Sequence, residues 1–204
     1  MAIHLIPPMK TFLTEIKTSL LLTLVFALLL CGAYPFVVWA GAQTFFADKA
    51  NGSLVTDKDG TVRGSLLLAQ NFSSDKYFQP RPSAAGTGYD ATSSSGTNLG
   101  PTSQKLNDQI KARVAAYRTT NGLTADATVP ADAVTASASG LDPHISLANA
   151  QLQVARVAKA RNLQVAKVQS LLVALTEDRD WGVFGEPHLN VLRLNRALDH
   201  HEGE

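Results

Sequence analysis

The stretch LLTLVFALLLCGAYPFVVWA, residues 21–40, lies within a run of thirty residues, 18–47, that carries no charged side chain. At a rise of about 1.5 Å per residue, twenty helical residues cover roughly 30 Å, which matches the hydrocarbon thickness of a bilayer. The sequence therefore predicts a transmembrane helix over residues 18–42. The residues that follow have the mixed composition of a globular domain.

A cleaved signal peptide is the alternative interpretation, because Ala40, Gly41 and Ala42 resemble a cleavage site of small residues. Cleaved signals have apolar cores of about 7 to 15 residues, and this run is longer. A lipoprotein anchor at Cys31 is disfavoured because the bulky Leu30 precedes it. We therefore expect a retained anchor in which Cys31 faces lipid or a partner.

The predicted topology places a short N-terminus, residues 1–17, in the cytoplasm and a large domain, residues 43–204, outside it. Lysines at positions 10 and 17 precede the apolar run, and aromatic residues suited to a membrane interface lie toward its far end. Basic residues also follow the run, but long domains translocate largely regardless of charge.

The composition of the outer part limits its chemistry. Beyond residue 47 the chain has 157 residues, a normal size for one domain, with 16 basic and 16 acidic side chains. This neutral balance disfavours nucleic acid as a partner. The only cysteine lies in the apolar run, so the domain has no disulfide, no thiolate nucleophile and no cysteine-bound zinc.

Mixed strand and helix patterns predict an α/β (α+β) domain. Two β-prone segments, residues 53–56 and 61–68, flank the sequence DKDG, which is a hairpin signal. Prolines 80 and 82 impose an extended segment. The Gly/Ser/Thr-rich stretch 84–100 is predicted to be a long surface loop.

Three amphipathic helices are predicted after that loop. The first is capped by Thr102 or Ser103, the second runs from Ser146 to about Asn162, and the third covers about residues 165–175. On the second helix we expect Val154 and Val157 to face inward, and Gln151, Arg156 and Lys159 to face outward.

Three shorter segments are less clear. Residues 129–132 could start a short turn of helix, and residues 134–140 fit either a strand or a tightly packed loop. The pattern over residues 185–199 does not separate strand from helix.

Two motifs invite chemical interpretations. Residues 57–61, DKDGT, superficially resemble the phosphorylation loop of P-type ATPases, but Asp59 stands where a threonine belongs, and the chain has no glycine-rich phosphate loop. We interpret this segment as a hairpin turn. The ending Asp-His-His-Glu, residues 199–202, looks like a solvated tail rather than a metal site.

Asp142, His144 and Ser146 could suggest a hydrolase, but three sequence neighbours cannot usually align as a catalytic triad. A turn at Pro143 followed by a helix cap at Ser146 is the preferred interpretation. We therefore assign no catalytic, cofactor-binding or metal residues. Two alternatives stay open: a membrane-tethered serine hydrolase using Ser139 or Ser146 with His144, and an envelope module that binds a small ligand.

Several segments together resemble the C subunit of the Kdp potassium-transporting P-type ATPase, over about residues 30–199. The most specific is VTASASGLDPHIS, residues 134–146. The other matching segments are GAYP at 32–35, ANGSL at 50–54, RGS at 63–65, QNF at 70–72, YF at 77–78, RPSA at 81–84, GTNL at 96–99, RVAKAR at 156–161 and LNRALD at 194–199. Ala69, Thr97 and Arg196 depart from the family pattern.

The resemblance implies a non-catalytic accessory subunit with one membrane span in the bacterial inner membrane. Its partners are then the channel-like potassium-binding subunit and the P-type pump subunit of a high-affinity uptake complex, together with the lipid bilayer. ATP, magnesium and potassium act at the level of that complex. The subunit is expected to support assembly, ion entry or, indirectly, the nucleotide affinity of the pump.

Docking or structural roles are expected where matching segments carry polar or small residues. The small residues of the segment 134–146 allow another backbone to approach closely, whether it belongs to a partner or to this chain. The candidates are Asn51, Gly52, Gln70, Arg81, Ser137, Ser139, Gly140, Asp142 and His144.

Overall fold

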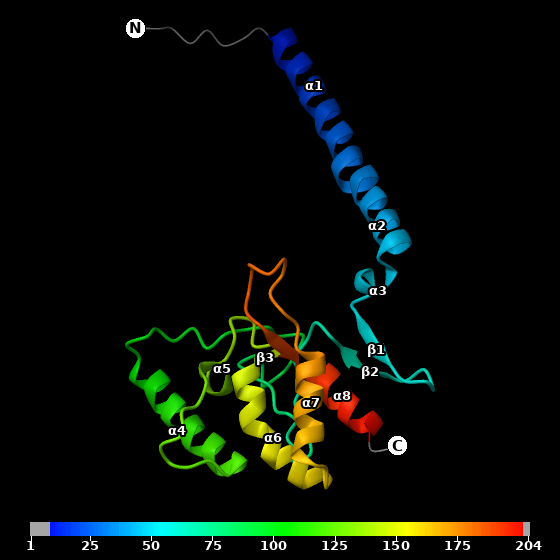
Figure 1. The fold of residues 1–204 in the computed structure, drawn as a ribbon. Coiled ribbons are helices and arrows are strands. Elements are labelled where there is room, and N and C mark those ends of the chain that lie inside the picture. The colour runs from blue at the N-terminus through cyan, green and yellow to red at the C-terminus, as the bar shows by residue number, and fades with distance from the viewer. Residues whose placement is uncertain (1–8, 202–204) are drawn as a thin grey trace. The chain divides into compact units, whose positions relative to one another are not determined.

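The computed structural model describes residues 9–201 and separates into two units that meet between Asn51 and Gly52 (Figure 1). The first unit is a continuous apolar helix made of α1 (Met9–Ala27), the π-helical segment η1 (Leu28–Ala33) and α2 (Tyr34–Phe45), followed by the short α3 (Ala47–Ala50). Residues Thr11–Phe45 have the length and apolar composition needed to cross a membrane. The predicted apolar helix is therefore present, and it extends beyond residues 18–42 at both ends.

The π-helical segment follows from Pro35. Proline has no N–H, so an α-helix would leave the carbonyl of Cys31 without its usual donor, and the proline ring would crowd it. The wider turn relieves this, and the Tyr34 N–H donates to the carbonyl of Leu29, five residues earlier. Apolar side chains are exposed on all sides of this helix, Cys31 among the exposed residues, a pattern typical of a membrane span.

The second unit has a mixed helix and sheet fold, as predicted. The strands β1 (Leu54–Thr56) and β2 (Val62–Ser65) form the expected antiparallel hairpin. A second antiparallel pair joins β3 (His144–Ser146) to β4 (His188–Asn190), with Ile145 opposite Leu189. The helices are α4 (Gln104–Asn121), α5 (Ala131–Val134), α6 (Leu147–Arg161), α7 (Val165–Leu175) and α8 (Val191–His201).

Local capping explains the helix ends that the sequence predicted correctly. The Ser103 side chain accepts from Leu106 N–H at the start of α4, and Ser146 accepts from Asn149 N–H at the start of α6. Asn162 ends α6 in the left-handed conformation. The predicted helix over 165–175 matches α7.

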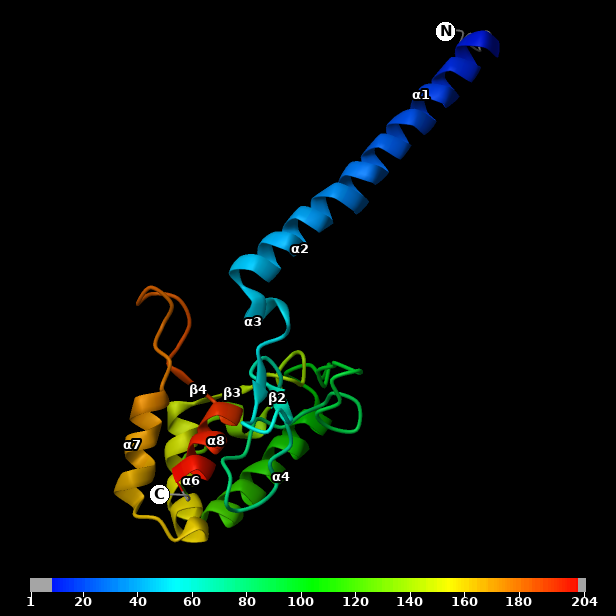
Figure 2. The ribbon, with the colours of Figure 1, turned by 90° about the vertical axis from the view of Figure 1, so that its right-hand side faces the viewer.

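The core lies where α6, α7 and α8 pack together with the β3–β4 pair and the segment that carries Phe78 (Figure 2). Its largest buried apolar side chains are Phe78, Ile145, Val157, Val168, Leu172, Leu189, Leu194 and Leu198. No side chain from the Gly/Ser/Thr-rich stretch 84–100 belongs to this cluster, although Ala85 is fully buried. That stretch contains neither helix nor strand, as predicted.

Two expectations were wrong. Arg156, expected to face outward on α6, is only 8% exposed. Asp199 and His200, expected in a solvated tail, are exposed but belong to α8, and Asp199 accepts a hydrogen bond of 2.7 Å from Arg161 Nη2. Glu202, the last residue of that motif, lies outside the described residues. In both cases a distant segment supplies partners that the local pattern does not reveal.

Candidate docking site

The segment 134–146 packs against this chain's own loop 84–100. The carbonyl of Ser139 accepts from Ser95 N–H at 3.0 Å and from Ser94 Oγ at 3.0 Å. The carbonyl of Gly140 accepts from Ser83 Oγ at 2.6 Å. A Cβ added to Gly140 would lie 2.5 Å from the carbonyl oxygen of Ser95. Gly140 is therefore required for packing within the chain, whereas Ala138 and Ser139 are exposed.

Asp142 connects this segment to the extended proline segment. Its Oδ2 accepts from Arg81 Nη1 at 2.8 Å, and its Oδ1 accepts from the His144 N–H at 3.0 Å. The His144 ring Nδ1 lies 3.5 Å from the same Oδ1. Burial raises the pKa of the Asp142 carboxyl, but the hydrogen bonds from His144 and Arg81 outweigh burial and lower this pKa to about 2. The carboxyl is therefore ionised at neutral pH.

Arg81, Asp142 and His144 share a shallow cavity of about 410 Å³ with residues of the β3–β4 pair. The ring of His144 packs edge-on against that of His188, with 4.5 Å between ring centroids. The structure thus brings together three of the predicted candidates and adds His188, which sequence reasoning missed. Only the strand pairing reveals His188, because it lies far from His144 along the chain.

The serine residues near His144 are not arranged for nucleophilic catalysis. Ser146 Oγ donates to Asp132 Oδ1 at 3.0 Å and accepts from Asn149 N–H at 3.0 Å, so it caps α6. Ser139 Oγ accepts from Leu141 N–H at 3.1 Å and lies 3.4 Å from Ser137 Oγ. In the described part of the chain neither serine is hydrogen-bonded to His144, and a nucleophile needs such a base.

The remaining candidates lie apart from this cavity. Gln70 packs on Gly64, where an added Cβ would lie 1.8 Å from its Nε2. The carbonyl of Gly52 accepts from Ser65 Oγ at 2.6 Å. Asn51 belongs to the helical unit, where its Nδ2 donates to the carbonyl of Ala47 at 2.7 Å. These contacts are structural. Within residues 9–201 no group of three His, Cys, Asp or Glu side chains is placed to hold a metal ion.

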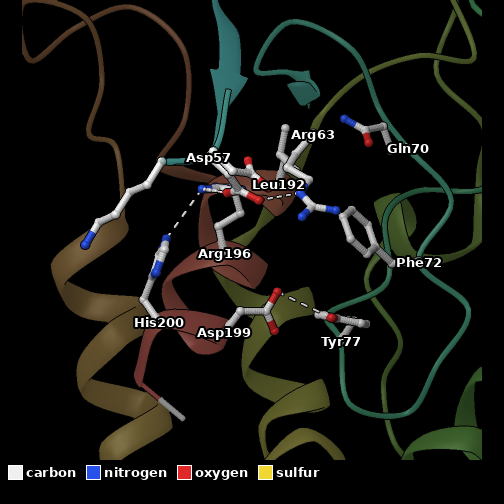
Figure 3. A pocket seen from close by; sticks show the side chains of 11 residues that line it. Asp57, Arg63, Gln70, Phe72, Tyr77, Leu192, Arg196, Asp199 and His200 are labelled. Atoms are coloured by element: carbon white, nitrogen blue, oxygen red, sulfur yellow. Dashed lines mark hydrogen bonds and ion pairs between the residues drawn. The ribbon is translucent and has the colours of Figure 1, made fainter. Parts of the chain in front are cut away.

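A second cavity, of about 700 Å³, lies between the β1–β2 turn and α8 (Figure 3). Asp57 lies at its edge, where it pairs with Arg63 and, at 2.6 Å, with Arg196 Nη2. Hydrogen bonds from Arg63 and Arg196 lower the pKa of the Asp57 carboxyl. The turn closes through Asp57 N–H to the Thr61 carbonyl at 2.9 Å. Asp57 therefore fixes a hairpin turn to a helix.

Asp57→Asn is expected to leave the ATPase rate of an assembled complex within about twofold of wild type. The ion pairs that it removes are partly exposed, with side-chain exposures of 53% for Arg63, 24% for Asp57 and 19% for Arg196, and they hold a hairpin turn rather than a phosphorylation site. The measurement is the potassium-stimulated ATPase rate and the yield of phosphorylated pump subunit. Loss of phosphorylation would contradict the structural interpretation of this turn.

Asp142→Asn is expected to lower the free energy of unfolding at pH 7 by about 1 to 2 kcal/mol, because asparagine loses the charge-assisted bond to Arg81. Folding lowers the pKa of Asp142 from 3.8 to about 2. The contribution of the Asp142 carboxylate to stability is therefore complete at pH values above the pKa of the unfolded state. It is lost as the pH falls through the pKa of the folded state. Urea denaturation followed by circular dichroism at pH 7, 4 and 2 tests this.

The exposed residue Asp126 supplies the control, since among the described residues its carboxylate makes no ion pair with an arginine, and Arg118 acts on it only through its more distant charge. Its effect on stability is expected to stay below that of Asp142→Asn at pH 7. A deficit of the Asp142 variant that is as large at pH 2 as at pH 7 would contradict the assigned role of the carboxylate.

Comparison with known proteins gives one family. The family model described as KdpC, K+-transporting ATPase, c chain, matches residues 16–200. The potassium-transporting ATPase KdpC subunit of Mycobacterium tuberculosis (strain H37Rv) is 51% identical over 185 residues, which cover 91% of this chain and 97% of that protein. The subunit of the same name from Nitratidesulfovibrio vulgaris is 53% identical, covering 92% and 94%. That of Rhodospirillum rubrum is 50% identical, covering 92% and 96%.

Proposed function

Because this chain belongs to the KdpC family, the c chain of K+-transporting ATPases, we propose that its globular unit docks on the channel-like potassium-binding subunit and the P-type pump subunit of that complex. The chain is a non-catalytic accessory subunit of a potassium-transporting ATPase. By docking, it is proposed to support assembly, ion entry or, indirectly, the nucleotide affinity of the pump in a high-affinity uptake system.

The observation that carries this proposal is the continuous apolar helix Thr11–Phe45 joined to a domain in whose described residues Ser139 and Ser146 are bonded to groups other than His144. A helix that is apolar on every side requires lipid or other membrane helices around it. It therefore restricts the globular unit to the membrane surface, where it meets membrane-embedded subunits at high effective concentration.

ATP, magnesium and potassium are proposed to act on the other subunits rather than on this chain. With the globular unit outside the cytoplasm of a bacterial cell and the span in the inner membrane, this unit cannot contact cytoplasmic ATP. Any effect on the nucleotide affinity of the pump is then indirect and passes through the docked subunits.

The test is affinity purification of the tagged full chain from native membranes, with identification of the proteins that co-elute. We expect a potassium-binding subunit and a P-type pump subunit, and a potassium-stimulated ATPase that is lost when the gene for this chain is deleted. A chain that elutes alone from membranes with an intact ATPase would contradict the proposal. Reaction with a serine-directed probe would favour a hydrolase instead.

The topology is tested by cysteine labelling in a Cys31→Ser background. A cysteine at the exposed loop residue Ser93 is expected to react with an impermeant thiol reagent in intact spheroplasts, because the globular unit is proposed to lie outside the cytoplasm. A cysteine at Lys17, before the apolar run, is the matched control and is expected to react only after lysis. The opposite labelling pattern would reverse the proposed orientation.

A further inference from the structure

The loop between α7 and β4, residues 176–187, ends in an apolar tip exposed to solvent. Trp181 is 92% exposed, Val183 71% and Phe184 61%. Figures 1 and 2 show this loop, coloured orange, extending away from α7 and from the rest of the globular unit. Large apolar side chains that cluster in water mark an interaction site more often than a structural one.

The tip is preorganised. Asp180 and Phe184 exchange two backbone hydrogen bonds of 2.9 and 3.0 Å, and Glu177 and His188 do the same at the base of the loop. The rings of Trp181 and Phe184 pack edge to face, 6.0 Å apart. Because the conformation is already fixed by these contacts, little conformational entropy is lost when a partner binds.

The charges around the tip define what can cover it. Glu177 pairs with Arg193 at 2.7 Å, and Glu186 pairs with Arg179 at 2.5 Å. The carboxylates of Asp178 and Asp180 are exposed and make no ion pair within the described residues 9–201. The tip therefore combines an apolar wedge with two uncompensated negative charges.

We propose that the loop tip formed by Trp181, Val183 and Phe184 inserts into an apolar pocket on another subunit of the ATPase, at whose rim Lys or Arg side chains meet Asp178 and Asp180. The inference rests on the proposed function, since it requires the complex. Anionic lipid is a poorer match, because its surface repels the two carboxylates. An aromatic anchor in a pocket ringed by complementary charge is the usual composition of an interface hot spot.

The direct test replaces Trp181 with the photo-crosslinker p-benzoylphenylalanine in the full chain, within the membrane-embedded complex. Irradiation is expected to yield an adduct with another subunit. The same replacement at Val173, 77% exposed on α7, is the control position and is expected to give at least tenfold less of that adduct. An adduct with lipid alone, or equal adducts from both positions, would overturn the proposal.

A second test adds the purified full chain at increasing concentrations to an ATPase complex prepared without this subunit, and measures how much of the chain co-elutes. The double variant Trp181→Ala with Phe184→Ala is expected to raise the chain concentration that gives half-maximal co-elution at least about tenfold, and D178K with D180K about tenfold. Val173→Ala is expected to leave this concentration unchanged. The thermal midpoints of these variants should match wild type, because the altered side chains are exposed. Unchanged binding of the Trp181 and Phe184 variant would overturn the inference.

The two proposals fail in different ways. If the wild-type chain does not co-elute with any ATPase subunit, the proposed function is wrong. If the wild-type chain co-elutes and the tip variants do so equally well, the accessory role stands and only the assignment of the tip is wrong. If D178K with D180K strengthens binding to vesicles of anionic lipid while leaving co-elution unchanged, the tip faces lipid.

Discussion

Replacing Gly140 with alanine is expected to lower the free energy of unfolding of the globular unit by about 2 to 5 kcal/mol. Two costs combine. Gly140 has a φ of +68°, a left-handed conformation that disfavours any residue with a Cβ. The new Cβ would also lie 2.5 Å from the Ser95 carbonyl oxygen and 2.7 Å from the Ala85 nitrogen. Both are backbone atoms, so neither can rotate away as a side chain could.

Two other glycines separate these costs. Gly88 has a φ of +116° but nothing within 4 Å of its added Cβ, so Gly88→Ala should show only the conformational strain. Gly100 has an open site and no positive φ, so Gly100→Ala should leave stability nearly unchanged. Urea denaturation of the detergent-solubilised full chain, followed by circular dichroism, gives all three values. If Gly140→Ala were no worse than Gly88→Ala, the close packing of segment 134–146 on loop 84–100 would not be important for stability.

Replacing Arg156 with leucine is expected to lower the free energy of unfolding by about 3 to 5 kcal/mol. Its guanidinium donates to Asn121 Oδ1 at 2.9 Å and to Gln153 Oε1 at 2.8 Å. It also donates to the carbonyls of Asp75 at 2.7 Å and Tyr77 at 3.0 Å. Leucine would fill part of the space but would remove donors from buried acceptors, and an unpaired buried acceptor costs more than its hydrogen bond contributes.

The matched control is Arg193→Leu, which breaks an ion pair with Glu177 on the surface. Exposed pairs of this kind contribute about 0 to 1 kcal/mol, so a much smaller effect is expected. Hydrogen exchange of the full chain shows which part of the fold is destabilised. In the Arg156 variant, backbone amides around Phe78 should lose protection from exchange, because the guanidinium holds that segment against α6. Equal effects of the two variants would show that burial of Arg156 is not what makes it important.

The candidate site illustrates what sequence reasoning can find. The resemblance singled out Arg81, Asp142 and His144, and the structure brings them to one cavity. Sequence reasoning could not find His188, because this residue reaches His144 only through the pairing of β4 with β3. Nor did it identify the tip at Trp181, because an isolated aromatic residue in a sequence carries no information about its exposure.

The sequence by itself determined the features whose causes are local. An uncharged apolar run specifies the long helix, Asp-Gly specifies the hairpin, and the caps at Ser103, Ser146 and Asn162 specify where α4 and α6 begin or end. Each depends on interactions between residues a few positions apart, so a short window of sequence contains the whole cause.

Only the tertiary structure decided the features that depend on distant partners. Residues 185–199 become β4 followed by α8 because β4 finds β3 and α8 packs on α7. Arg156 is buried because the carbonyls of Asp75 and Tyr77 accept hydrogen bonds from it, and Asp199 is anchored because it accepts a hydrogen bond from Arg161. Free energies of burial and hydrogen bonding depend on what surrounds a residue in space. Periodicity along one helix therefore cannot reveal that a charged side chain has buried partners.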